Sequence, residues 1–310
     1  MSGLVALDWG TSSLRAFRFD DTGKLKETRA RPWGIRHLPE GGYDAALAGI
    51  TADWPALPRV ACGMVGSRNG WREMPYLDLP AGAAQLGDAL GSVRAADGMD
   101  VHLIPGLHDP RGPDVMRGEE TQLIGALALR PELAATSTFI LPGTHSKWAV
   151  VRDGAVTGFR TLMTGELFAV LRQHSILGAT GVDAADDAKA FARGVVAARD
   201  SGAAGALSRL FSTRALMLGG ALPPASVPDY LSGLLIGEEF RAALADGLAR
   251  RDAPLPLIGE TALCERYRRA AALFDIELPA PIADAAAHGL WQLAARAGLV
   301  QTDSRKSCAC

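Results

Sequence analysis

A short apolar run followed by Gly-Thr-x-Ser occurs twice in this 310-residue sequence. The first copy joins Leu4–Trp9 to Gly10–Ser13, and the second joins Phe139–Leu141 through Pro142 to Gly143–Ser146. In each copy a second apolar run follows, and then a turn containing Asp and Gly, which is typical of a β-hairpin. The sequence therefore predicts two hairpins of the same design, each with a glycine and hydroxyl groups at its tip.

The two tips have the composition of phosphate-binding turns. Gly10 allows a ligand to approach the backbone closely, and free N–H groups with the hydroxyls of Thr11 and Ser12 suit phosphate oxygens. Asp8, at the end of the first strand, adds a carboxylate that suits a hard cation such as Mg²⁺. An ordinary hairpin with a polar turn would explain one copy alone. Two copies indicate two related halves that face one another across a nucleotide.

The two copies differ at two informative positions. Asp8 of the first copy aligns with Leu141 of the second, and Lys147 of the second aligns with Leu14 of the first. This asymmetry predicts a metal ligand in the first half and a phosphate-binding cation in the second. The phosphate-binding candidates are Gly10, Thr11, Ser12 and Arg15 in the first half, and Gly143, Thr144, Ser146 and Lys147 in the second.

A helix with an acidic start follows the first half. Leu123, Ile124 and Leu127 predict one apolar face of a helix that begins near Glu119, and Glu120 lies on the same face. Favourable interaction of acidic residues with the helix dipole explains Glu119 well and Glu120 less well. A carboxylate on an apolar face binds its proton more tightly, which suits a general base. Glu120 is therefore the candidate base.

A polar and aromatic loop follows the apolar run of residues 59–66. Ser67, Arg68 and Trp71 are typical of a loop that holds a polyol or a carboxylate. A surface turn at Asn69-Gly70 is the alternative explanation.

Five elements are predicted in the second half. A turn leads into a helix with Thr164 as its cap and Glu166 near its start. Residues 216–220 are predicted as a weak strand, and residues 229–248 as a helix. The short strand of residues 255–259 ends at Gly259 and leads into a helix beginning at Glu260, an arrangement that seats nucleotides but is also common packing.

Length and composition limit the remaining choices. We expect two domains, residues 1–134 and 135–280, then a helix at 281–300 that packs back on the first domain, and a disordered tail at 301–310 containing Cys308 and Cys310. A formal net charge of −2 predicts no general attraction to nucleic acid or membranes. No apolar run is long enough to span a membrane, and four scattered cysteines form no disulfide framework, so a cytoplasmic location is expected. Neither a P-loop nor a Rossmann fingerprint occurs.

Five separated motifs resemble the 2-dehydro-3-deoxygalactonokinase family. They are Leu7–Ser12, Gly63–Ser67, Pro142–Trp148, Met163–Phe168 and Leu231–Glu239. The resemblance covers roughly residues 3–298 in the same order. It implies an α/β fold of the actin/hexokinase/heat-shock ATPase superfold: two actin-like (ribonuclease H-like) domains with a duplicated βββαβ core and a central nucleotide cleft. Leu141-Pro142 departs from the acidic second phosphate motif that is usual in the superfold.

The resemblance implies an ATP- and Mg²⁺-dependent kinase of galactonate catabolism, acting on the 6-hydroxyl of 2-dehydro-3-deoxy-D-galactonate. Asp8 would hold Mg²⁺, and Glu120, with Glu119 as its rival, would deprotonate the sugar hydroxyl. Arg68 would bind the substrate carboxylate. Around the sugar would lie Ser67, Trp71, His145 and Glu166, and beside adenosine Gly237 and Gly259.

Two other functions stay open. The Gly118-Glu119-Glu120 segment also resembles exopolyphosphatases of the same superfold, in which a Glu assists attack on phosphate and water is the acceptor. A non-catalytic nucleotide switch is the other alternative. The preference between galactonate- and gluconate-derived epimers, the presence of a homodimer and the role of the Cys-Ala-Cys tail are not decided by the sequence.

Overall fold

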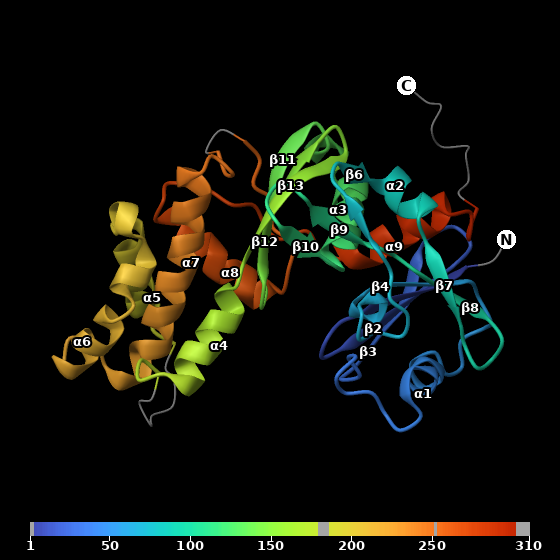
Figure 1. Ribbon diagram of the computed structural model, residues 1–310, viewed down its shortest axis with the longest axis horizontal. Coiled ribbons are helices and arrows are strands. Elements are labelled where there is room, and N and C mark those ends of the chain that lie inside the picture. The colour runs from blue at the N-terminus through green and yellow to red at the C-terminus, as the bar shows by residue number, and fades with distance from the viewer. Residues whose placement is uncertain (1–2, 179–185, 251–252, 302–310) are drawn as a thin grey trace. The chain divides into compact units, whose positions relative to one another are not determined.

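The computed structural model describes residues 3–178, 186–250 and 253–301, and the chain forms two compact units (Figure 1). Unit 1 comprises Met1–Ala135, Val151–Gly158 and Asp284–Cys310, and unit 2 comprises Thr136–Val150 and Phe159–Ala283. The division between them falls within two strands, β12 (Ser146–Arg152) and β13 (Ala155–Leu162). Apart from Gln301, the tail for which disorder was predicted lies outside the described residues.

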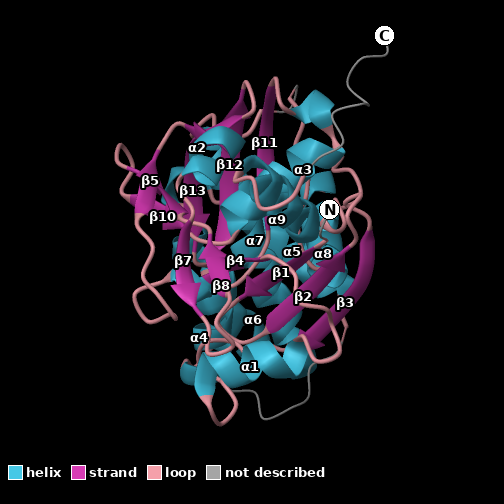
Figure 2. Ribbon diagram, turned by 90° about the vertical axis from the view of Figure 1, so that its right-hand side faces the viewer, coloured by secondary structure: helices cyan, strands magenta, loops and turns pink. Residues whose placement is uncertain are grey.

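Unit 1 is built on a six-stranded sheet of order β3-β2-β1-β4-β8-β7, whose strands lie side by side in Figure 2. Their bounds are β1 Leu4–Trp9, β2 Leu14–Phe19, β3 Leu25–Arg31, β4 Arg59–Gly63, β7 Gly91–Arg94 and β8 Asp100–Leu103. β1 pairs antiparallel with β2 and parallel with β4, so that Asp8 lies between Arg15 and Cys62. The first predicted hairpin is confirmed, and its tip joins two strands whose apolar side chains are buried.

Smaller elements complete unit 1. The helices are α1 Gly42–Ile50, α2 Ala83–Asp88, α3 Glu119–Leu129 and α9 Ala285–Arg296, and a three-stranded sheet of order β10-β9-β5 contains β5 Tyr76–Asp78, β9 Gly106–Asp109 and β10 Asp114–Met116. Glycines allow α3 and α9 to cross closely: a Cβ on Gly125 would lie 1.8 Å from the Ala285 carbonyl oxygen, and one on Gly289 would lie 1.8 Å from that of Thr121. This crossing holds the first turn of α3, the predicted acidic start.

Unit 2 combines strands with a group of helices. β11 (Thr136–Leu141), β12, β13 and the short β6 (Ala81–Gly82) form a sheet in that order. β6 belongs to unit 1, and it pairs with the segment of β13 that belongs to unit 1. The helices are α4 Thr164–His174, α5 Ala188–Arg199, α6 Ser212–Leu218, α7 Val227–Ala245 and α8 Thr261–Ala272, and in the whole chain 3₁₀ turns lie at Met64–Gly66, Pro131–Leu133, Gly202–Ala204, Ala206–Arg209 and Pro224–Ser226. The helices predicted for residues 229–248 and from Glu260 are confirmed as α7 and α8.

Close packing of α5 against α7 depends on small residues. A Cβ on Gly194 would lie 2.1 Å from the Tyr230 carbonyl oxygen, and one on Gly237 would lie 2.9 Å from both the Val195 carbonyl oxygen and the Ala198 Cβ. The helix crossing therefore accounts for a glycine at position 237 without any ligand.

Three local predictions differ from the structure. Residues 216–218 belong to α6 and not to a strand, because Leu216 and Met217 pack against an apolar helical cluster around Tyr230. Residues 255–259 make only an isolated bridge, between Leu257 and Ile140, because Pro256 has no N–H to donate to a ladder. Thr164 is the first residue of α4 and not its cap.

Candidate active site

The first turn, Gly10–Ser13, is braced from behind by the following loop. The Gly10 N–H donates to the Ser13 carbonyl oxygen at 2.9 Å, and the Arg36 N–H donates to that of Thr11 at 3.2 Å. A Cβ on Gly34 would lie 2.2 Å from the Thr11 carbonyl oxygen, so only glycine permits this approach. The side chains of Ser12 and Ser13 are exposed. The turn is thus fixed at its backbone and presents hydroxyl groups to its surroundings.

Asp8 forms an ion pair with Arg15, its neighbour across the β1–β2 pair. The Asp8 side chain is 15% exposed and that of Arg15 is 48% exposed. On the other side, the Cys62 thiol lies 3.9 Å from Oδ1 of Asp8. The carboxylate therefore stands at the end of a buried strand with one positive partner beside it.

Glu120 is fully buried at the start of α3, as its place on the apolar face predicts. Its carboxylate accepts hydrogen bonds from the Gly118 N–H at 2.6 Å and from the Thr121 hydroxyl at 3.0 Å. Burial, reinforced by the neighbouring Glu119 carboxylate, raises the pKa of Glu120 to about 8. Glu119 is only partly buried and accepts from the Arg117 N–H at 3.1 Å. The two acids therefore differ in access to solvent.

The loop after β4 has a rigid base and an exposed edge. The Trp71 ring stacks on Tyr43, with centroids 5.3 Å apart, and meets Trp9 edge-on at 6.0 Å. Arg68 is exposed, whereas Ser67 is buried and its hydroxyl has no hydrogen-bond partner. Of these predicted substrate contacts, Trp71 is held by packing and Arg68 is free to move.

The second turn, Gly143–Ser146, is packed against the start of α4. A Cβ on Gly165 would lie 2.6 Å from the Gly143 carbonyl oxygen, and the Glu166 N–H donates to that of Thr144 at 3.0 Å. The same contact brings the side chains of His145 and Glu166 together, with Nε2 and Oε2 2.5 Å apart. The structure therefore joins two predicted substrate residues that are distant in sequence.

The remaining residues of this turn point inward. Ser146 is fully buried, and its hydroxyl lies 3.0 Å both from the Glu239 carboxylate and from the Tyr267 phenol oxygen. Lys147 is also buried, and its ammonium donates to the His145 carbonyl oxygen at 3.3 Å. Only Thr144 and His145 have exposed side chains here. The structure thus places the predicted phosphate ligand Ser146 in an internal network.

The centre of that network is Glu239 of α7, which sequence reasoning missed. Its fully buried carboxylate accepts hydrogen bonds from the Tyr267 phenol at 2.6 Å and the Trp148 indole at 2.9 Å, and from the Ser146 and Thr164 hydroxyls. Burial raises the pKa of Glu239. Its spacing from Leu235 and Ile236, both buried in α7, was the available signal, because it places an acid on an apolar face.

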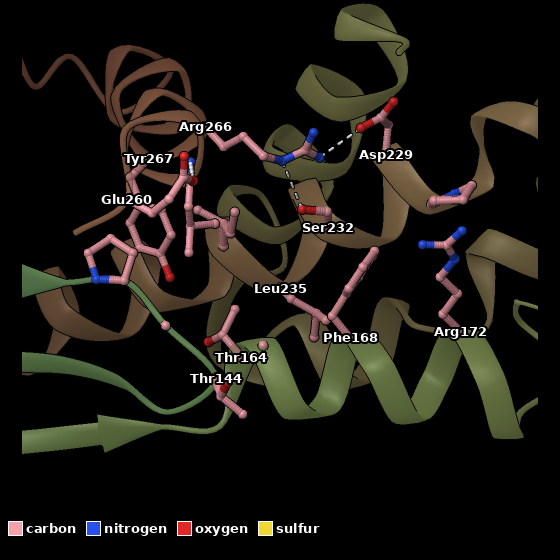
Figure 3. A pocket seen from close by; sticks show the side chains of 16 residues that line it. Thr144, Thr164, Phe168, Arg172, Asp229, Ser232, Leu235, Glu260, Arg266 and Tyr267 are labelled. Atoms are coloured by element: carbon pink, nitrogen blue, oxygen red, sulfur yellow. Dashed lines mark hydrogen bonds and ion pairs between the residues drawn. The ribbon is translucent and has the colours of Figure 1, made fainter. Parts of the chain in front are cut away.

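A cavity of about 640 Å³ opens in unit 2 beside the second turn (Figure 3). Its volume lies within the roughly 300–1,000 Å³ of sites for small molecules. Its wall is formed by the second turn with the preceding Pro142, by α4, α7 and α8, and by Glu260 directly before α8. The lining residues are Pro142, Gly143, Thr144, Thr164, Gly165, Phe168, Arg172, Pro228, Asp229, Ser232, Leu235, Ile236, Glu260, Leu263, Arg266 and Tyr267.

Arg266 is the fixed cation of this cavity. Nη2 lies 2.7 Å from the Asp229 carboxylate, Nε donates to the Ser232 hydroxyl at 3.2 Å, and the guanidinium lies 4.5 Å from the Phe191 ring centroid (Figure 3). The side chain is therefore held in one orientation before any ligand binds. Arg172 of α4, which also lines the cavity, is exposed.

The two predicted adenosine glycines do not line the cavity. Gly259 packs near Pro142 and Cys264, where a Cβ would lie 3.2 Å from the thiol sulfur. The next residue, Glu260, does line it, and its carboxylate accepts from the N–H groups of Ala262 and Leu263 at 3.0 and 2.9 Å. Because Glu260 already caps α8, the N-terminus of α8 does not offer those N–H groups to a phosphate.

Glu239→Gln is expected to lower the unfolding temperature and to raise the KM for ATP. The amide replaces one accepting oxygen by a donor, so at least one buried donor loses its acceptor, at a cost of about 1–3 kcal/mol. Thr164 and Tyr267, which line the cavity, lose their anchor. Thermal unfolding and initial rates at varied ATP measure both effects.

The control variant is Glu238→Gln, on the same helix. It removes the ion pair with Arg241 but no contact of the network. An unchanged KM for ATP in Glu239→Gln would contradict the anchoring role.

Nothing in the described ranges gathers three or more side chains that could hold a metal ion, and no helix there is long and apolar enough to cross a membrane. That the turns at Gly10 and Gly143 serve one nucleotide stays a prediction.

Known proteins match almost the whole chain. The family model described as 2-keto-3-deoxy-galactonokinase matches residues 8–293. The 2-dehydro-3-deoxygalactonokinase of Escherichia coli strain K12 is 39% identical over 287 residues, covering 91% of this chain and 94% of that protein. A crystal structure of a Sinorhizobium meliloti protein described as a 2-dehydro-3-deoxygalactonokinase superposes with a TM-score of 0.85 at 36% identity, covering 94% of this chain and 98% of the other.

A more distant structure has the same fold. The activator of the 2-hydroxyisocaproyl-CoA dehydratase from Clostridium difficile, with bound ADPNP, matches with a TM-score of 0.52 at 13% identity over 95% of both chains. These matches confirm the predicted α/β fold of the actin-like ATPases.

Proposed function

The chain belongs to the 2-keto-3-deoxy-galactonokinase family, and from this membership we propose that it transfers the γ-phosphoryl group of ATP to the 6-hydroxyl of 2-dehydro-3-deoxy-D-galactonate. The match over residues 8–293 is the observation that carries the proposal. It includes the two turns, the acidic start of α3 and the cavity of unit 2. A kinase of galactonate catabolism is the function that this membership supports best.

ATP binds, in this proposal, to the cavity of unit 2. The apolar lining residues Phe168, Leu235 and Leu263 suit a purine ring, and the ordered cation Arg266 lines the same cavity. Thr144 and the first turn of α4 offer a hydroxyl and helix N-terminal N–H groups, which suit phosphate oxygens. The cavity therefore has an apolar part and an anion-binding part.

The first turn and Asp8 bind phosphate oxygens and Mg²⁺. A Mg²⁺ ion in phosphoryl transfer needs only one or two protein carboxylates, since phosphates and water supply the other ligands. Asp8, partly exposed beside a turn with free hydroxyls, fits that requirement. When bound, the ion neutralises charge on the phosphates. Arg15, now paired with Asp8, adds a second positive charge, as does Lys147 at the other turn.

The acceptor hydroxyl is oriented and deprotonated by the acids at the start of α3. Glu120 has the raised pKa that suits a base at neutral pH, and Glu119 has the better access. Ser67, Arg68 and Trp71 contact the sugar acid, together with the His145–Glu166 pair. Transfer of this kind depends on positioning and charge neutralisation, and exclusion of water prevents hydrolysis.

The experiment is a coupled ADP-release assay with ATP, Mg²⁺ and a panel of 2-keto-3-deoxy sugar acids. We expect turnover with 2-dehydro-3-deoxy-D-galactonate, and the panel measures the preference over the gluconate-derived epimer. Phosphate release from polyphosphate without any sugar acid would favour a hydrolase. ATP binding without turnover on any sugar acid would favour a nucleotide switch. The cytoplasmic location and the homodimer stay predictions.

A further inference from the structure

Arg117 is a buried arginine that has no ion-pair partner among the described residues. It directly precedes Gly118 and the acidic start of α3, and it is 9% exposed. Nη2 donates to the Met74 carbonyl oxygen at 2.8 Å, while Nε and Nη1 have no hydrogen-bond partner. Among the residues that the structure describes, no carboxylate forms an ion pair with its guanidinium. A buried donor without an acceptor destabilises the folded protein, and a charged donor does so more strongly. Such a site needs an explanation.

Two other arginines with a buried nitrogen that lacks an acceptor differ from Arg117. Arg18 pairs with Glu27 and Arg59 pairs with Asp97, so their charges are compensated although one nitrogen of each lacks an acceptor. Arg117 has two nitrogens without an acceptor, and no carboxylate among the described residues forms an ion pair with it. This difference points to an anion that is supplied from outside the chain.

A second group without a hydrogen-bond partner is carried by the loop segment that approaches Arg117. Ser67 is buried and its hydroxyl has no partner. It follows Gly66, and a Cβ on Gly66 would lie 3.1 Å from Nη1 of Arg117, so the loop backbone approaches the guanidinium closely here. The loop after β4 and the residue before α3 thus bring three unmatched polar atoms into one region of unit 1.

We propose that Arg117 and Ser67 bind the carboxylate of the sugar acid, in place of the exposed Arg68. A guanidinium has planar donors that match the two oxygens of a carboxylate, and the Ser67 hydroxyl supplies a further donor. The region adjoins the two acids proposed to act on the acceptor hydroxyl. This assignment rests on the proposed function. In it, the Arg117 guanidinium and the Ser67 hydroxyl make the enzyme prefer a sugar acid over a neutral sugar.

Access to the guanidinium is controlled by one exposed side chain. The Tyr76 ring lies over Arg117 with its centroid 4.3 Å from Cζ, and Tyr76 is 41% exposed. The carboxylate reaches the buried nitrogens when this ring turns away. The phosphate groups of ATP are assigned to the turns at Gly10 and Gly143, so Arg117 is not needed to bind them.

The test compares 2-dehydro-3-deoxy-D-galactonate with its neutral C1 carboxamide in the coupled ADP-release assay. We expect Arg117→Met to lower kcat/KM for the acid at least about 100-fold, because two charge-assisted hydrogen bonds are lost. We expect kcat/KM of the same variant for the amide to stay within about threefold of the wild-type value, so that the preference for the acid disappears. Arg117→Lys keeps the positive charge but loses the planar arrangement of guanidinium donors. We expect its kcat/KM for the acid to lie between the values of the wild type and of Arg117→Met.

Ser67→Ala keeps the test decisive if the arginine variants do not fold. It removes a buried hydroxyl without a partner, so we expect the unfolding temperature to be equal or higher. We also expect kcat/KM for the acid to fall about tenfold, a result that a merely structural role would not give. The control is Arg94→Met, which breaks an exposed ion pair with Asp100.

The proposal fails if Arg117→Met keeps the preference for the acid, if Ser67→Ala leaves that preference at the wild-type value, or if Arg68→Met removes it. Wild-type protein that releases no ADP with any sugar acid would instead refute the proposed function. Wild-type protein that uses acid and amide equally well would show that no group of the chain reads the carboxylate.

Discussion

Replacing Asp8 by alanine is expected to lower kcat at least about 1,000-fold while the protein stays folded. Asp8 is the carboxylate at the end of β1, beside the first turn, and the account makes it the ligand of Mg²⁺. Its loss removes the charge that holds the ion against the phosphates. The fold is retained because the ion pair with the half-exposed Arg15 contributes little, about 0–1 kcal/mol. Initial rates of ADP release at saturating ATP, with thermal unfolding beside them, measure both.

Asp21→Ala is the matched control. Asp21 is an exposed acid in the turn between β2 and β3, so its loss removes the same charge from the same sheet. We expect wild-type kcat from this variant. A kcat within tenfold of the wild type in Asp8→Ala would contradict the assignment of Asp8.

The second large effect is expected at the start of α3. Glu120→Gln should lower kcat by about 100- to 10,000-fold, because an amide accepts no proton from the sugar hydroxyl. With a pKa of about 8, roughly a tenth of Glu120 is ionised at pH 7, so wild-type kcat/KM rises with pH and levels off above about 8. In Glu120→Gln we expect a low kcat and no increase of kcat/KM with pH. A pH series of initial rates measures them.

Stability gives an independent reading of the same group. The pKa of Glu120 is about 8 in the folded protein and close to the ordinary glutamate value of 4.5 in the unfolded chain. The folded state therefore holds the proton more tightly. The stabilisation from this proton is fully present below about pH 4.5 and is lost as the pH rises to about 8. Glu120→Gln removes this slope from the unfolding free energy.

Glu119→Gln decides between the two acids. If it, and not Glu120→Gln, abolishes turnover and the rise with pH, the base is Glu119. Wild-type rates from both variants would leave the transfer without the base proposed here.

Local patterns were sufficient for the elements that carry the site. The hairpin around Gly10, the start of α3 at Glu119 and the helices α7 and α8 follow from apolar periodicity and from turn residues. The burial of Glu120 also followed from its helical spacing. In each case the signal lies within a few residues of the feature that it predicts.

Properties that depend on distant partners could not be read from the sequence. Ser146 lies in a turn whose composition predicts phosphate binding. Its hydroxyl instead donates a hydrogen bond to the buried carboxylate of Glu239, which is far along the chain. The family resemblance implies a place beside adenosine for Gly237, yet this glycine allows the close crossing of α5 and α7. The unmatched charge of Arg117 is visible only once its surroundings are known. The directions of side chains are therefore the part that required the structure.

The most direct test of the kinase assignment is to follow the phosphoryl group itself by ³¹P NMR. The protein is incubated with ATP, Mg²⁺ and 2-dehydro-3-deoxy-D-galactonate, and products are quantified over time. The account predicts a 6-phosphomonoester that forms in equal amount with ADP, and no reaction when the sugar acid is omitted. Inorganic phosphate released at the same rate with and without the sugar acid would contradict it.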